Sequence, residues 1–189
     1  MTRRELILYA TPTGDLAAAC DRYFEAVATI GPTTAQHYPP HCTLTGFFRR
    51  TGPEAELVIA EIGILIERAG PVPDGAVEVV ELAARPGWIG LELRSSWLTE
   101  LTADIAARVD SPPGTDPLRA KDWLHLSLAY GIDGLDAHAA LALDLVDPTA
   151  AAGWDVALWE RGPDDGWTRH RSLGGTGNVG WTSGTTSGA

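Results

Sequence analysis

Residues 123–130 of the chain read Trp-Leu-His-Leu-Ser-Leu-Ala-Tyr, an apolar run interrupted by one imidazole and one hydroxyl. Side chains two residues apart in a β-strand point to the same face. His125 and Ser127 are therefore expected to project together. Leu126 and Leu128 face the other way and can anchor the strand in a core. The pattern predicts a half-buried strand that carries polar chemistry on one face.

A second stretch repeats this arrangement closer to the N-terminus. Residues 38–44 read Tyr-Pro-Pro-His-Cys-Thr-Leu and lead into a predicted strand over residues 41–48. His41 and Thr43 share one face of that strand, whereas Cys42 points to the other, so a nucleophilic thiol is not expected. An imidazole, with an ordinary pKa of about 6.5, can move a proton at neutral pH, and a hydroxyl can donate to a phosphoryl oxygen. Two such pairs would supply an acid, a base and two donors without a metal.

The pattern His-x-Ser/Thr is weak by itself, because short motifs also match by chance. It occurs a third time at His170, where the neighbouring residues are polar, and we interpret that copy as part of a surface edge strand. His41 and His125 differ from it because apolar residues fill the alternate positions around them. Either histidine alone could equally be a hydrogen-bonded structural residue. Their matched hydroxyls and surroundings favour catalysis.

The rest of the chain alternates predicted helices and strands. Helical spacing, caps and Pro/Gly breaks predict helices over residues 16–30, 53–69, about 95–109 and 136–146. Short apolar runs bounded by turn residues predict further strands, with two hairpins, over residues 5–11, 76–84, 88–94, 153–161 and 167–173. Hairpins imply antiparallel pairing, so the predicted class is α+β. We expect one domain over residues 1–173 and a flexible tail rich in Gly, Ser and Thr over residues 174–189.

Composition limits the possible partners. The chain has 189 residues, with 14 Lys plus Arg against 25 Asp plus Glu and a net charge of −11. A groove for a long nucleic acid needs a basic stripe, so long nucleic acid is an unexpected partner. A small anionic ligand remains compatible, because a few cations can reverse the field within one cleft. No apolar run is long enough to span a membrane, and we expect a cytoplasmic monomer.

The two motifs, 84 residues apart (125 − 41 = 84), resemble those of the two-histidine (2H) phosphoesterase superfamily. This superfamily includes 2′,3′-cyclic phosphodiesterases and RNA 2′,5′-ligase-like proteins, and the resemblance covers about residues 5–173. It implies a bilobal fold, in which two pseudo-symmetric lobes with antiparallel sheets surround a central cleft and each donates one motif. It also implies that His41 and His125 are the catalytic acid–base pair.

The same resemblance implies that Thr43 and Ser127 bind the phosphoryl oxygens and that Tyr130 is a further cleft residue. No cofactor or metal is implied. The predicted activity is metal-independent hydrolysis of a 2′,3′-cyclic nucleotide or a related ribose cyclic phosphate, which is a small-molecule substrate. Two alternatives stay open. One is an RNA-end enzyme that cuts or joins 2′,5′ linkages, and the other is a non-catalytic module that binds a nucleotide in the same cleft.

Other residues receive simpler interpretations. Trp88 and Trp123 lie within or beside predicted elements and are expected in the core. His138 begins an Ala-rich helix and is expected on the surface. Arg119 and Lys121 lie close to the second motif in the sequence, where a cation near a phosphate and a solvated loop charge are equally compatible with the pattern.

Overall fold

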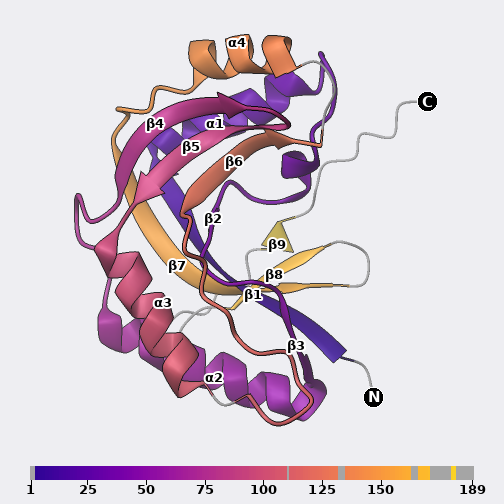
Figure 1. Ribbon diagram of the computed structural model, residues 1–189, viewed down its shortest axis with the longest axis vertical. Coiled ribbons are helices and arrows are strands. Elements are labelled where there is room, and N and C mark those ends of the chain that lie inside the picture. Colours follow the sequence, from indigo (N-terminus) through magenta and orange to yellow (C-terminus); the bar gives the residue numbers. More distant parts are fainter. Residues whose placement is uncertain (1–2, 110, 132–134, 163–165, 171–179, 182–189) are drawn as a thin grey trace.

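The computed structural model describes residues 3–109, 111–131, 135–162, 166–170 and 180–181. Helices and strands alternate along the chain, as Figure 1 shows. In chain order the elements are β1 (Arg3–Gly14), α1 (Asp15–Val27), the 3-10 turn η1 (Thr34–His37), β2 (Cys42–Thr43), β3 (Phe48–Thr51), α2 (Gly52–Ala69), β4 (Glu78–Arg85), β5 (Trp88–Arg94), α3 (Ser96–Arg108), β6 (His125–Tyr130), α4 (Leu135–Leu145), β7 (Ala152–Arg161), β8 (Trp167–His170) and β9 (Gly180–Trp181).

The strands form one hydrogen-bonded sheet in the order β4-β5-β6-β2-β1-β7-β8-β9, and β3 pairs with β1 outside this path. Neighbouring strands are antiparallel, so the predicted α+β class is confirmed. The two histidine-bearing segments are distant in sequence but adjacent in the sheet, because β2 pairs with β6. Strands from both halves of the chain share this sheet, and the division into two lobes stays a prediction.

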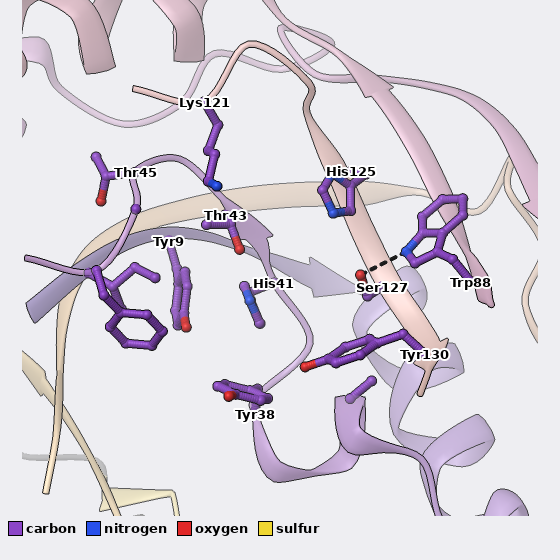
Figure 2. Close-up of a pocket in the computed structure, with 14 residues that line it drawn as sticks. Tyr9, Tyr38, His41, Thr43, Thr45, Trp88, Lys121, His125, Ser127 and Tyr130 are labelled. Carbon is purple, nitrogen blue, oxygen red and sulfur yellow. Dashed lines mark hydrogen bonds between the residues drawn. The ribbon is translucent and has the colours of Figure 1, made fainter. Parts of the chain in front are cut away.

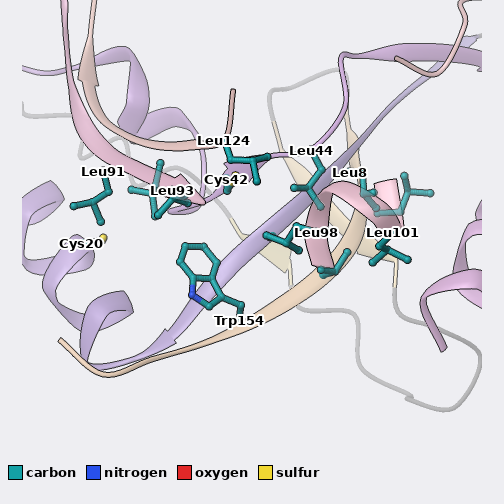
Figure 3. Packing of buried hydrophobic residues seen from close by; sticks show 14 of the residues in the cluster. Leu8, Cys20, Cys42, Leu44, Leu91, Leu93, Leu98, Leu101, Leu124 and Trp154 are labelled. Atoms are coloured by element: carbon teal, nitrogen blue, oxygen red, sulfur yellow. The ribbon is translucent and has the colours of Figure 1, made fainter. Parts of the chain in front are cut away.

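The helices α1 to α4 cover one face of the sheet. Leu8, Cys42 and Leu126, from three central strands, are buried in one apolar cluster with side chains of all these helices; Figure 3 shows part of it. Their chain neighbours point to the opposite face, where Tyr9 and Trp159 belong to a smaller cluster that contains no helical side chain. Strand alternation thus leaves a helix-free face. Cys42 is a free, buried thiol on the helix-covered side, as predicted.

The helices form two pairs at the two ends of the sheet. α1 packs against α4, and α2 packs against α3, as Figure 1 shows. The sequence sets the ends of α2: Thr51 and Glu54 form a capping box, and Gly70 follows the last residue with φ 77°. Ser95 begins α3 in the same way, because its hydroxyl accepts a hydrogen bond from the Leu98 N–H at 3.1 Å.

The prediction of one strand over residues 41–48 is wrong. The segment forms β2, a break and β3. Both strands pair with β1, but in different registers, since Tyr9 lies opposite Thr43 and Leu6 lies opposite Phe48. Thr45 pairs with Ala120 in an isolated bridge. The buried Thr45 hydroxyl also accepts from the Leu8 N–H at 3.0 Å and so replaces a main-chain acceptor beside β1. A side chain that substitutes for a ladder hydrogen bond leaves no periodic signal in the sequence.

The C-terminal end of the predicted fold is described in part. The predicted strand over residues 167–173 is observed as β8, and its last three residues lie outside the described residues. Of the predicted tail over residues 174–189, Gly180–Trp181 form β9 and pair with β8, so these two residues belong to the sheet. Among the described residues, no helix is both long enough and apolar enough to cross a lipid bilayer.

Candidate active site

A cavity of about 370 Å³ opens on the helix-free face of the sheet, and Figure 2 shows its lining. It collects every residue that the sequence predicted for the site: His41, Thr43, His125, Ser127 and Tyr130. The side chains of both motifs are partly exposed at the His and Ser/Thr positions, while the Leu and Cys positions between them are buried. The structure therefore brings the predicted residues together, and their catalytic roles stay predictions.

The two motifs are arranged around a local two-fold axis. Cys42 and Leu126 lie directly opposite each other in the antiparallel β2–β6 pair. Continuing this register by one residue in each direction places His41 opposite Ser127 and Thr43 opposite His125. Side chains directly opposite are about 4.5–5.5 Å apart at Cβ, and diagonal neighbours are about 7–8 Å apart. The imidazoles thus occupy one diagonal of a square and the hydroxyls the other.

Each imidazole is fixed by the main chain two residues before it. The Nδ1 atom of His41 lies 2.6 Å from the Pro39 carbonyl oxygen, and that of His125 lies 3.2 Å from the Trp123 carbonyl oxygen. A carbonyl oxygen only accepts, so Nδ1 carries the hydrogen in both rings. Nε2 is left to accept a proton in the neutral ring or to donate one in the charged ring. Both tautomers are therefore set by equivalent contacts.

An aromatic ring packs against each imidazole. The Tyr9 and His41 ring centroids are 3.8 Å apart with planes tilted by 32°, and those of Trp123 and His125 are 3.9 Å apart with planes tilted by 23°. Trp88 meets His125 edge-on at 5.6 Å. These contacts exclude water from part of each ring and restrict its rotation. They hold the Nε2 atoms in place.

Both histidines are less basic than a free imidazole. The pKa of His41 is lowered to about 4, mainly by burial. The hydrogen bond to Pro39 opposes this decrease, and nearby His125 adds to it. Burial also lowers the pKa of His125, and the positive charge of Lys121 acts in the same direction. The carbonyl hydrogen bond of its own ring and the charge of Glu92 oppose that decrease. Both rings are therefore mainly neutral at pH 7 in the free protein.

We expect His41 to make the free energy of unfolding fall between pH 6.5 and pH 4. In this interval the unfolded chain protonates the residue and the folded chain does not, so acid favours unfolding, whereas above pH 6.5 both states are neutral. A pKa lowered from 6.5 to about 4 corresponds to at most about 3 kcal/mol. Urea unfolding at pH 7 and at pH 4.5 measures the difference. His41→Gln should show a smaller loss, and an unchanged loss would contradict the assignment.

The hydroxyl of Ser127 is oriented by a tryptophan. Its Oγ accepts a hydrogen bond from the Trp88 Nε1–H at 2.9 Å, which is the dashed line in Figure 2. One lone pair is then engaged, and the hydroxyl hydrogen can point into the cavity. Gly90 makes this contact possible, because a Cβ at this position would collide with the Trp88 ring and with the Leu126 carbonyl oxygen. The Thr43 hydroxyl has no hydrogen-bond partner in the described part of the chain, so both hydroxyls can donate.

Two tyrosines close the cavity beside His41 (Figure 2). The ring centroid of Tyr38 lies 5.8 Å from that of His41. Burial, and then the neighbouring Tyr38 phenol, raise the pKa of Tyr130, so its hydroxyl stays protonated and can donate. The buried Thr33 connects the two segments, since its hydroxyl accepts from the Tyr130 N–H at 3.1 Å. The predicted place of Tyr130 in the cleft agrees with the lining of the cavity.

Two interpretations from the sequence are wrong. His138, expected on the surface, is buried, and its Nδ1 lies 3.4 Å from the Tyr23 hydroxyl. Trp123, expected in the core, is 44% exposed and covers the His125 ring. The sequence contained a signal for the place of Trp123. It lies two residues before His125 in an alternating strand, so it points to the same face as His125 and Ser127.

The remaining basic residues differ in where they lie relative to the cavity. Lys121 lines both the cavity and an adjoining hollow, whereas Arg119 lines the hollow and not the cavity. His170, in the third motif, does not line the cavity, and its Nε2 lies 2.9 Å from Glu160 Oε2. No group of three or more His, Cys, Asp or Glu side chains that could hold a metal ion occurs among the described residues.

Comparison with known proteins gives one distant similarity. No protein-family model matches the chain. The ecdysteroid-phosphate phosphatase of Bombyx mori is 23% identical over 165 residues, which cover 85% of this chain and 25% of the phosphatase. The chain thus spans about a quarter of the length of the curated relative that it matches. It is similar, over most of its own length, to part of a protein named for a phosphoester-cleaving activity.

Proposed function

We propose that the chain is a metal-independent phosphodiesterase that hydrolyses a 2′,3′-cyclic nucleotide or a related ribose cyclic phosphate. The observation that carries the proposal is the pair of imidazoles on one cavity, each with Nδ1 held by a carbonyl oxygen and with Nε2 unpartnered within the described part of the chain. A hydroxyl lies beside each ring. The two helix pairs at the ends of the sheet support the bilobal arrangement of the 2H superfamily, which the motifs resemble.

The proposed reaction needs two proton transfers and no electron transfer. A water oxygen attacks phosphorus while one ribose P–O bond breaks, and the cyclic diester opens to a phosphomonoester. Nε2 of one histidine takes a proton from the water, and Nε2 of the other gives a proton to the departing ribose oxygen. Imidazoles on a diagonal allow the two oxygens to lie in line on either side of phosphorus. Each transfer contributes typically about 10²–10⁴-fold to the rate.

The pKa values favour His41 as the base and His125 as the acid. A general base acts from its neutral form and a general acid from its charged form. Both rings have a lowered pKa, and the decrease is the larger one at His41. The bound diester anion, in turn, stabilises the charged form of His125. His41 would thus begin the reaction in the neutral form that its own surroundings favour, and His125 would take up its proton when the diester anion binds.

The size and charge of the site support a small substrate. A cavity of about 370 Å³ is within the range of small-molecule sites, and the net charge of −11 opposes binding of a long phosphate backbone. The similarity to a phosphatase supports phosphoester hydrolysis in general. That relative is named for a steroid phosphate, so a phosphomonoester is the appropriate comparison substrate.

We expect the purified chain to open 2′,3′-cyclic nucleotides in the presence of EDTA. The two histidines supply both proton transfers, so chelation should leave the rate unchanged. Phosphorus NMR can follow the appearance of the nucleoside monophosphate, with 3′,5′-cyclic nucleotides and p-nitrophenyl phosphate as comparison substrates. Loss of activity on chelation, or hydrolysis of the monoester alone, would contradict the proposal.

Further outcomes of the same experiment distinguish the alternatives. Cleavage of 2′,5′-linked oligonucleotides at a higher kcat/KM than cyclic mononucleotides would favour an RNA-end enzyme. Binding of a cyclic nucleotide, detected by calorimetry, without any turnover would favour a non-catalytic module.

A further inference from the structure

The charge of the cavity is opposite to that of the chain. Acidic residues outnumber basic ones by 25 to 14, yet no Asp or Glu of the described part of the chain lines the cavity. Glu92, cross-strand from His125, is paired with Arg85 and does not belong to the lining. Among the described residues, Lys121 is the one Lys or Arg that lines the cavity. In such an acidic protein, this distribution indicates a site for a small anion.

Lys121 is positioned by main-chain hydrogen bonds next to the first motif. Its N–H donates to the Leu44 carbonyl oxygen at 2.9 Å, and the Gly46 N–H donates to the Arg119 carbonyl oxygen at 3.0 Å. Together with the bridge at Thr45, these contacts attach the segment before β6 to the segment after β2. The main chain of Lys121 is therefore fixed relative to both motifs.

The ammonium group of Lys121 is directed into the site. Figure 2 shows its side chain extending toward the space between Thr43 and His125. Within the described part of the chain, the ammonium has no carboxylate partner and no hydrogen-bond acceptor, whereas Arg85, Arg94 and Arg108 all form ion pairs. Burial lowers the pKa of His125, and the nearby charge of Lys121 acts in the same direction. A cation with free donors lies beside the proposed reaction centre.

We propose that Lys121 binds a non-bridging oxygen of the substrate phosphate and thereby makes the cavity selective for the single negative charge of a phosphodiester. This inference rests on the proposed function. A diester carries one negative charge, whereas a monoester carries about 1.5 to 2 at pH 7. One ammonium offsets the charge of the diester. A monoester would bring further charge out of water without a second cation in the lining to offset it.

The polar groups of the cavity then have different roles. Thr43 and Ser127 donate neutral hydrogen bonds to the phosphoryl oxygens, while Lys121 supplies a full charge from the side of Thr43. Charge-assisted hydrogen bonds are roughly twice as strong as neutral ones. The lysine is expected to act on binding of the diester and on the charge that develops as water attacks.

The test compares Lys121→Met and Lys121→Arg with the control Arg119→Met. Arg119 is an exposed cation on the same segment, two residues away, and its side chain faces the adjoining hollow. With a 2′,3′-cyclic nucleotide, Lys121→Met should lower kcat/KM about 10- to 100-fold, the range for a hydrogen bond to a charged group. Lys121→Arg should keep a larger share of the activity, and Arg119→Met should stay within about twofold of the parent. Equal activity of the two methionine variants would overturn the proposal.

A binding measurement separates this inference from the proposed function. Calorimetry with the same cyclic nucleotide is carried out on the parent and on Lys121→Met. If the parent shows no turnover but its affinity falls in Lys121→Met, the anion site stands and the catalytic proposal fails. If the parent is active and neither kcat/KM nor affinity changes in Lys121→Met, catalysis stands and the role of Lys121 is refuted.

Discussion

His41→Ala and His125→Ala are each expected to lower kcat/KM for a 2′,3′-cyclic nucleotide by about 10³-fold or more. Each change removes one proton transfer, for which contributions of about 10²–10⁴-fold are typical. The Nδ1 contacts to Pro39 and Trp123 show that each ring already presents Nε2 in a single tautomer. Among the described residues, His41 and His125 are the only histidines that line the cavity, so neither ring has a substitute there. Steady-state kinetics in EDTA measure the effect.

His170→Ala is the matched control for this pair. It also removes the histidine of a His-x-Ser sequence, but this residue contacts Glu160 outside the cavity, so activity should stay close to that of the parent. The double variant of His41 and His125 should be no worse than the more damaging single variant, because the two rings act as a unit. A tenfold loss or less in either single variant would exclude the two-histidine mechanism.

Thr43→Val and Ser127→Ala are expected to lower kcat by about 10²-fold each. Removal of one preorganised donor to a developing oxyanion costs about 10²–10³-fold in comparable sites. The effect should appear in kcat more than in KM, since the hydrogen bonds strengthen as charge develops on the phosphoryl oxygens. Ser127→Ala also leaves the Trp88 Nε1–H without its acceptor. Its loss is therefore expected to be at least as large as that of Thr43→Val.

The conservative exchanges Thr43→Ser and Ser127→Thr provide the controls, because each keeps a hydroxyl at the same corner of the square. They should retain most of the activity. Trp88→Phe keeps an aromatic ring and removes the donor to Ser127, so a smaller loss in kcat than for Ser127→Ala is expected. If the conservative exchanges are as inactive as the deletions, the hydroxyls contribute through packing and not through donation.

The site face could be predicted from the sequence because strand alternation is local. Leu126 and Leu128 are buried against the helices, and their position fixes the side of the sheet on which His125 and Ser127 emerge. The helix boundaries followed from equally local chemistry, such as the Ser95 cap of α3. In these segments, the burial of a residue can be predicted from the residues next to it in the chain.

The parts that were missed depend on contacts between distant segments. Lys121 enters the cavity because its N–H pairs with Leu44, far away in the sequence. His138 is buried because Tyr23, from another helix, lies against it. The break between β2 and β3 depends on the Thr45 hydroxyl, which replaces a main-chain acceptor for β1. None of these partners has a fixed spacing in the sequence, so no periodic pattern could reveal them.

A local two-fold axis between Cys42 and Leu126 relates the positions of the two imidazole–hydroxyl pairs. A rotation about it exchanges the imidazoles and also the carbonyls that set their tautomers. The positions of the two imidazoles alone would thus not select the 2′- or the 3′-oxygen as the leaving group. The choice of leaving oxygen falls to groups that break the symmetry, with Lys121 on one side and Tyr38 and Tyr130 on the other. Under the proposed mechanism, the regiochemistry would be set by how the cavity orients the sugar. Changes to these three side chains should then invert the product ratio more readily than changes to the histidines.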